Sequence, residues 1–225
     1  MRDGPVTTVN RVVQIGFHRC GTRALTHLFA ASGYRAAHWR IKREGGFLNL
    51  ARMMRKNIAA GVPPFRGFED YAFLSDLECW DDGQVWSGFK QFRAIDAAYP
   101  GTTFLLNTRD KDDWLQSRLT HRRYAQKTIA AHDLKGIAEL LAFWSAEWDD
   151  HLRDVSDYFA ERPDDLVRFD IDRDDIAELA RRLPAFTLDQ TSWRCVGRSQ
   201  PQHVAANLAA LKTFIANRAA AATAG

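Results

Sequence analysis

The sequence has few cysteines, and none of them is in a metal-binding spacing. Cys20, Cys79 and Cys195 are an odd number, lie far apart and form no C-x-x-C pair. A disulfide framework needs paired cysteines, and a structural zinc site needs closely spaced ones. We therefore expect reduced thiols, no disulfide scaffold and no metal centre.

Long hydrophobic runs and a strong charge imbalance are also missing. No apolar stretch reaches the length of about 18 residues that a membrane-spanning helix needs, and the opening MRDGPVTTVNR lacks the apolar core of a secretory signal. With 31 basic and 28 acidic residues the net charge is only +3, which gives no reason to expect nucleic acid as a partner. These absences predict a cytoplasmic protein without a transmembrane segment.

The composition is that of one folded α/β domain. The 225 residues are 46% hydrophobic and 26% charged, as in soluble globular proteins. Short apolar runs are typical of strands at 11–17, 84–89, 102–108 and 165–170, with 34–39 as a further strand or extended segment. Between them, helical patterns occupy 22–32, 44–61, 90–101, 110–130, 134–152, 173–183 and 201–218. This alternation predicts a three-layer fold with a mostly parallel central sheet, in a single domain over 1–225 whose end, 219–225, frays.

The segment GFHRCGTR, residues 16–23, joins the first predicted strand to the first predicted helix and has the pattern of a phosphate-binding loop. Glycines at such a junction let several backbone N–H groups point inward, toward an anion held at the helix N-terminus. The Thr22 hydroxyl and the Arg19 and Arg23 cations would add to the site. The N–H groups expected to line it belong to Arg19, Cys20, Gly21, Thr22 and Arg23. The alternative is an ordinary strand-to-helix turn.

The loop lacks the lysine of a nucleotide-hydrolysing P-loop. Thr22 follows the second glycine, where that lysine normally reaches the terminal phosphates, and Arg23 stands where a hydroxyl would hold magnesium. Magnesium-dependent phosphoryl transfer is therefore disfavoured. A P-loop nucleotide kinase or hydrolase stays an alternative, as does a non-catalytic nucleotide-binding module.

The same loop resembles the 5′-phosphosulfate loop of the sulfotransferases that use 3′-phosphoadenosine 5′-phosphosulfate (PAPS). Arg19 matches the cationic residue of that loop, and Gly21 and Thr22 match directly. His18 and Cys20 replace the usual proline and the usual serine or threonine. The GTRAL variant is particularly similar to the heparan sulfate sulfotransferase branch.

A second stretch resembles the 3′-phosphate site of the same family. In FLLNTRDKDDWLQSR, Arg109 follows a predicted strand and Ser117 comes eight residues later, in the following helix. An arginine can bind a phosphate through two hydrogen bonds, and a serine hydroxyl can donate a third. The alternatives are a surface ion pair of Arg109 with Asp110 or Asp112, and a solvated helix position for Ser117.

The resemblance implies sulfuryl transfer from PAPS to a hydroxyl or amine, leaving adenosine 3′,5′-bisphosphate and requiring no metal. The acceptor would be a small molecule or a saccharide, and Arg19 would stabilise the leaving oxygen. The family also brings a basic loop over the cofactor near the end of the domain. In this chain Arg194 and Arg198, within 193–202, are candidates for that contact, and a surface loop is the alternative.

A base is needed to accept the proton of the acceptor hydroxyl. His38 is the first candidate, since imidazole has a suitable pKa and related enzymes carry a histidine or glutamate near this position. Glu69, Asp76 and Glu78 are the alternatives, each also able to act as a solvated or helix-capping carboxylate. His18, inside the loop, is expected to contact the cofactor or to shape the loop.

Overall fold

The computed structural model describes residues 10–196 and 200–223. The strands are β1 (Val12–Gln14), β2 (Ala36–His38), β3 (Arg40–Arg43), β4 (Gly46–Asn49), β5 (Phe73–Ser75), β6 (Glu78–Asp81), β7 (Gln84–Ser87), β8 (Thr103–Thr108) and β9 (Leu166–Asp170). The α-helices are α1 (Thr22–Ala31), α2 (Leu50–Ala59), α3 (Phe92–Ala98), α4 (Lys111–Leu119), α5 (Tyr124–Ala131), α6 (Ile137–Tyr158), α7 (Ile176–Arg182) and α8 (Pro201–Thr223). Short 3₁₀ turns are η1 (Gly88–Gln91), η2 (Pro163–Asp165) and η3 (Gln190–Ser192).

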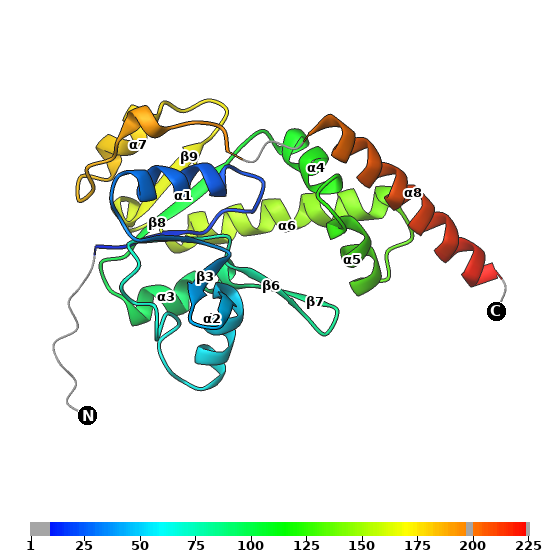
Figure 1. Ribbon diagram of the computed structural model, residues 1–225, viewed down its shortest axis with the longest axis horizontal. Helices are drawn as coiled ribbons and strands as arrows, with labels where there is room; N and C mark the ends of the chain where they lie inside the picture. Colours follow the sequence, from blue (N-terminus) through cyan, green and yellow to red (C-terminus); the bar gives the residue numbers. More distant parts are fainter. Residues whose placement is uncertain (1–9, 197–199, 224–225) are drawn as a thin grey trace. The chain divides into compact units, whose positions relative to one another are not determined.

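A parallel sheet forms the centre of the fold (Figure 1). In the described residues its strand order is β4-β3-β2-β5-β1-β8-β9, and β6 pairs with β7 separately. Strands β2, β5, β1, β8 and β9 run parallel to one another, whereas β3 pairs antiparallel with both β2 and β4. The predicted α/β class with a mostly parallel central sheet is confirmed.

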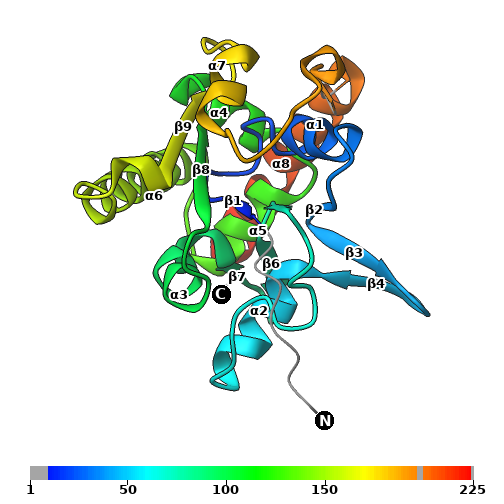
Figure 2. The same ribbon diagram turned by 90° about the vertical axis from the view of Figure 1, so that its left-hand side faces the viewer.

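Helices cover both faces of this sheet, which is why its central strands are apolar. Helices α1 and α7 lie on one face and α3 lies on the other (Figures 1 and 2). On the first face Phe29 of α1 stacks on Phe73 of β5, with ring centroids 4.2 Å apart. On the second face Phe92 and Ile95 of α3 are fully buried. The sheet is thereby fixed between two apolar layers, with its strand ends left to form a site.

The chain divides into two compact units. Of the described residues, the first unit comprises 10–79, 86–108 and 162–196, and it contains the seven-stranded sheet. The second comprises 80–85, 109–161 and 200–223, and it contains α4, α5, α6 and α8. Each unit is assembled from segments that alternate along the chain. The expected single domain therefore stays a prediction.

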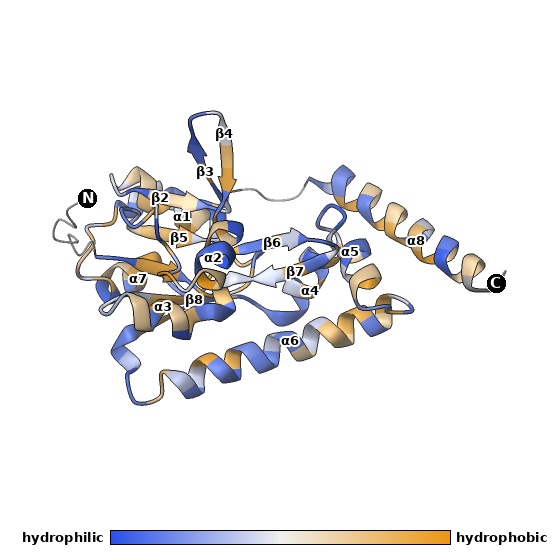
Figure 3. Ribbon diagram, turned by 90° about the horizontal axis from the view of Figure 1, so that it is seen from below, coloured by the Kyte–Doolittle hydropathy of each residue, from blue (hydrophilic) through white to orange (hydrophobic). Residues whose placement is uncertain are grey.

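A buried arginine organises the second unit. Arg118 is 2% exposed, and its guanidinium lies 4.8 Å from the ring centroids of Trp114, Tyr124 and Trp144. Its Nη1 donates to Glu147 at 2.8 Å, so the buried charge is paired. Helix α6 supplies Trp144, which is one of its buried residues. Figure 3 shows hydrophobic and hydrophilic residues alternating along this helix. No helix in the described ranges has both the length and the apolarity to cross a membrane.

Two of the helices predicted from the sequence were wrong in part of their length. The segment predicted as one helix over 44–61 begins with the β3–β4 hairpin, because Gly45 and Gly46 adopt positive φ angles of 82° and 146° and reverse the chain. Asn49 then caps α2 by accepting from the Arg52 N–H at 2.8 Å. The helix predicted over 110–130 is broken between α4 and α5, where Arg122 has a φ of 47°. Helix α8 reaches Thr223, and the fraying of 219–225 stays a prediction.

Gly16 lies where β1 passes close to β8, and this contact predicts a large effect of substitution. A Cβ at Gly16 would overlap the backbone oxygen and the side-chain amide of Asn107. We expect Gly16→Ala to lower the free energy of unfolding by about 3 kcal/mol, because neither group can move away. Chemical denaturation measures the change. Gly136→Ala is the control, since a Cβ there meets nothing within 4 Å. Equal stability losses in the two variants would contradict the proposed contact.

Candidate functional site

The loop between β1 and α1 has the backbone of an anion nest. Arg19 and Gly21 have positive φ angles of 71° and 75°, and Cys20 between them does not, which is the alternation that turns successive N–H groups inward. Helix α1 begins at Thr22 without a side-chain cap and without an acidic residue in its first turn. The first N–H groups of the helix have no acceptor within the helix. The loop is therefore suited to an anion at the N-terminus of α1.

Two buried amide side chains hold this loop in place. Gln14 of β1 and Asn107 of β8 are 0% and 1% exposed. The Gln14 Nε2 donates to the Gly16 carbonyl and to the Asn107 Oδ1, and the Asn107 Nδ2 donates to the Cys20 carbonyl. The Gln14 Oε1 accepts from the Asp76 N–H at 3.1 Å. Neither amide was predicted from the sequence, although each lies among buried apolar residues of its strand.

His38 and Asp76 meet beside the first residue of α1. The His38 Nε2 lies 3.0 Å from the Thr22 Oγ1 and 3.3 Å from the Asp76 Oδ2. The Thr26 Oγ1 donates to the Thr22 carbonyl at 2.8 Å and lies 2.7 Å from the Ser75 Oγ. His38 ends β2 and Asp76 follows β5, so both stand at the carboxyl ends of parallel strands, where such sheets bind ligands. The structure thus joins the loop to an imidazole–carboxylate pair.

Burial shifts the pKa values of both His38 and Asp76 toward their neutral forms. It lowers the pKa of His38 from its ordinary value of 6.5; the Asp76 charge opposes this shift and the Arg23 charge adds to it. Burial raises the pKa of Asp76, against the attraction of His38 and Arg19. The imidazole is therefore neutral near neutral pH, the state in which it can accept a proton.

The other candidate carboxylates have different neighbours. The Glu78 Oε2 lies 3.8 Å from the His18 Nδ1, and both side chains are buried. The Glu69 Oε2 accepts from the Gly67 N–H at 2.8 Å, within its own loop. Of the three carboxylates considered beside His38, Asp76 is the one in contact with it. His18, whose place in the loop the sequence left open, faces Glu78.

The residues considered for the second phosphate belong to the second unit. The Arg109 Nη2 lies 3.4 Å from the Asp113 Oδ2, and the Arg109 side chain is 20% exposed. Asp110 caps α4 by accepting from the N–H groups of Asp112 and Asp113 at 3.0 and 3.1 Å. Ser117 is partly buried in α4. Arg194 is exposed, and Arg198 lies outside the described residues. The cofactor-binding roles of Arg109, Ser117, Arg194 and Arg198 stay predictions.

Comparison with protein families identifies the class of the chain. A family model described as a sulfotransferase domain matches residues 11–181, which is more than half of the chain. The matched range includes the loop, His38, Asp76, Arg109 and Ser117. No curated protein matched the sequence. In the described part of the chain no cluster of three or more His, Cys, Asp or Glu side chains is arranged to hold a metal ion.

The opposing charges around His38 predict pKa changes of opposite sign. Asp76→Asn should lower the pKa of His38, because a negative charge that favours the imidazolium is removed. Arg23→Gln should raise it, because a repelling positive charge is removed. An NMR titration of the imidazole C–H resonances measures both values against wild type. Shifts in the same direction, or no shift in either variant, would show that these charges do not act on His38.

Proposed function

The chain belongs to the family of sulfotransferase domains, and we propose that it transfers a sulfuryl group from PAPS to a hydroxyl or amine acceptor, a small molecule or a saccharide. The observation that carries this proposal is the position of Thr22 between the nest and the candidate base. Thr22 begins α1 at the anion nest, and its hydroxyl contacts the His38 imidazole at 3.0 Å. An anionic donor in the nest and the candidate base would therefore meet at one residue.

The loop offers the groups that the 5′ end of PAPS requires. The nest at 19–21 and the first turn of α1 supply N–H donors, and Arg19 supplies a cation. Cys20 is fully buried, so it contributes its backbone. His18 is buried against Glu78 and shapes the loop. Arg109 and Ser117 are proposed for the 3′-phosphate on the strength of their motif, and Arg198 stays a candidate outside the described residues.

The chemistry proposed for the site is an in-line displacement. Bound PAPS supplies a sulfuryl group whose leaving group is the phosphate of adenosine 3′,5′-bisphosphate. His38 accepts the proton of the acceptor as the new bond to sulfur forms. The Asp76 carboxylate, 3.3 Å from the His38 Nε2, balances the positive charge that the imidazole gains. Arg19 and the loop N–H groups stabilise the electron pair that leaves on the phosphate oxygen.

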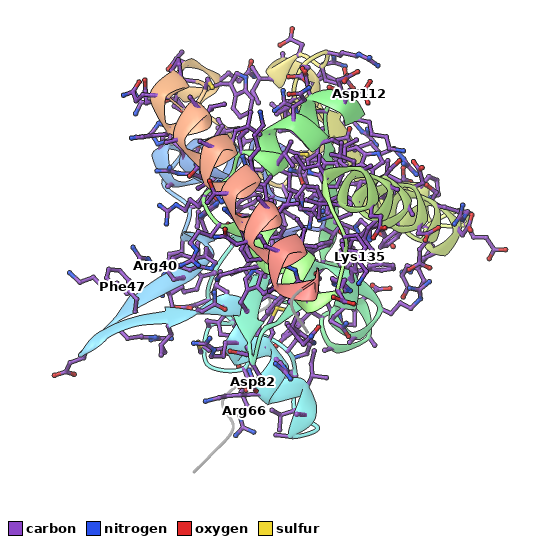
Figure 4. All side chains as sticks on the ribbon, turned by 90° about the vertical axis from the view of Figure 1, so that its right-hand side faces the viewer. Arg40, Phe47, Arg66, Asp82, Asp112 and Lys135 are labelled. Carbon is purple, nitrogen blue, oxygen red and sulfur yellow. The ribbon has the colours of Figure 1, made fainter. Side chains whose placement is uncertain are left out.

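Donor binding is expected without magnesium. Adenosine 3′,5′-bisphosphate should bind in the presence of a chelator, and Arg109→Ala should weaken binding by about 10- to 100-fold, because a charge-assisted hydrogen bond is lost. Isothermal titration calorimetry measures the affinity. Arg66→Ala is the matched control, since Arg66 is exposed in the 61–72 loop (Figure 4). Absence of nucleotide binding by wild type would overturn the proposed donor. Magnesium-dependent turnover of ATP would instead identify a kinase or hydrolase.

The proposed base predicts a rate effect and a pH profile. His38→Gln should lower kcat by about 10²- to 10⁴-fold, because the acceptor proton then has no positioned base. In wild type the acid limb of the kcat/KM profile, which reports the free protein, should lie below pH 6.5, since burial lowers the pKa of His38 from that value and the neutral imidazole is the active form. Transfer of labelled sulfuryl groups measures both. A His38→Gln variant with wild-type rate and profile would remove His38 from the reaction. Binding of the nucleotide without transfer to any acceptor would favour a binding module.

A further inference from the structure

The β3–β4 arm, residues 39–49, carries an unusual concentration of exposed apolar side chains. Across the described ranges the large hydrophobic residues that are exposed are Trp39, Phe47 and Leu48, at 43%, 58% and 42%. The arm extends the antiparallel edge of the first unit's sheet (Figures 2 and 3). Two of these apolar side chains, Trp39 and Phe47, gather around Arg40, and exposed apolar side chains with polar residues beside them mark a binding surface.

Arg40 is held between two of these rings. Its guanidinium carbon lies 5.1 Å from the Trp39 ring centroid and 4.2 Å from the Phe47 ring centroid. Figure 4 shows Arg40 and Phe47 together on the arm. Within the described residues no carboxylate forms an ion pair with Arg40. Stacking orients the planar guanidinium while its N–H groups stay available at the edge, which prepares it to bind an anion through two hydrogen bonds.

The arm is anchored beside the His38–Asp76 pair. The β2–β3 register pairs His38 with Arg40, so the backbones of the base and of the cation are neighbours, about 5 Å apart. Trp39 turns the chain between them with a φ of 61°. Its N–H donates to the Ser75 carbonyl at 3.0 Å, and its carbonyl accepts from the Leu50 N–H at 2.9 Å. Both ends of the arm are thus attached next to the proposed base.

We propose that Arg40, between Trp39 and Phe47, is the subsite for a carboxylate carried by the acceptor. This inference rests on the proposed function and names its acceptor class: a ring that bears a hydroxyl toward His38 and a carboxylate toward Arg40. The exposed Lys42 lies opposite Phe47 in the β3–β4 register and adds a second positive charge. Uronic acid saccharides and hydroxylated aromatic acids share this chemistry.

A small acidic molecule fits the arm better than a protein partner does. Each strand of the arm has four residues, whereas a stable protein interface uses about 20–30 residues on each side. The cations Arg40, Lys42 and Arg43 outnumber the single acid, Glu44. The charge of the arm therefore complements an anionic ligand, and the rings beside Arg40 offer apolar contact to a sugar or aromatic ring.

Binding of paired probes tests the subsite without requiring turnover. The protein, with adenosine 3′,5′-bisphosphate added, is titrated with 4-hydroxyphenylacetate and with its amide, and separately with glucuronate and with glucose. Within each pair the first compound carries a carboxylate and the second compound is uncharged. Ligand-observed NMR measures the affinities for wild type, Arg40→Gln, Arg40→Lys and the control Lys56→Gln. Lys56 is an exposed cation in the last turn of α2, so its variant removes the same charge elsewhere in the unit.

Wild type and Lys56→Gln should bind the carboxylate member of at least one pair about tenfold more tightly, and that pair identifies the ring. Arg40→Gln should bind both members equally, and Arg40→Lys should retain part of the preference, because lysine keeps the charge and loses the planar fork. A preference that persists in Arg40→Gln, or its absence in wild type for both pairs, would overturn the subsite.

The nucleotide separates this inference from the proposed function. Arg40→Gln should bind adenosine 3′,5′-bisphosphate as wild type does, because Arg40 is not part of the loop. If wild type fails to bind the nucleotide and still shows a charge preference that depends on Arg40, the proposed donor is wrong and the anion subsite stands. If the nucleotide binds and no preference exists, the subsite is wrong and the donor assignment stands.

Discussion

The site depends on the hydrogen bonds of two buried amides. A buried amide without partners costs several kcal/mol, about 2 or more for each unsatisfied group, so Gln14 and Asn107 fix the position of every group they contact. Those groups are the two carbonyls of the loop, at Gly16 and Cys20, and the backbone of Asp76. The hydrogen-bonded pair Gln14–Asn107 thereby links the Cys20 carbonyl of the anion nest to the backbone of Asp76. The geometry of the site follows from the core of the sheet.

Charge is distributed so that the imidazole stays neutral beside a carboxylate. Burial favours the neutral form of both groups, while their mutual attraction favours the charged forms. Arg19 and Arg23 act on different members of the pair, since Arg19 stabilises the Asp76 carboxylate and Arg23 disfavours the His38 imidazolium. The loop that would hold an anionic donor therefore also adjusts the basicity of the residue that would accept the proton.

Sequence patterns predicted the fold class and the loop but not the side-chain pairs. Apolar strands alternating with helical patterns predict a parallel sheet, and glycines around a strand–helix junction predict the turn at 16–21. The hairpin over 40–49 escaped prediction because RIKR and GFLN are too short and too polar for a clear strand period. Contact between His38 and Asp76 depends on the register of β2 against β5, which no local pattern specifies. Gln14 shows that one polar residue in an apolar strand is a useful signal of a network.

The hydrogen bonds of the Trp39 N–H and carbonyl groups have a consequence for how this fold can diversify. They close the base of the arm independently of what lies between residues 40 and 49. The arm is therefore a module: its length and sequence can change by insertion, deletion or grafting while Ser75, Asp76 and His38 keep their places. The proposed acceptor subsite can then change separately from the proposed donor loop, with one short hairpin exchanged and the frame around His38 retained.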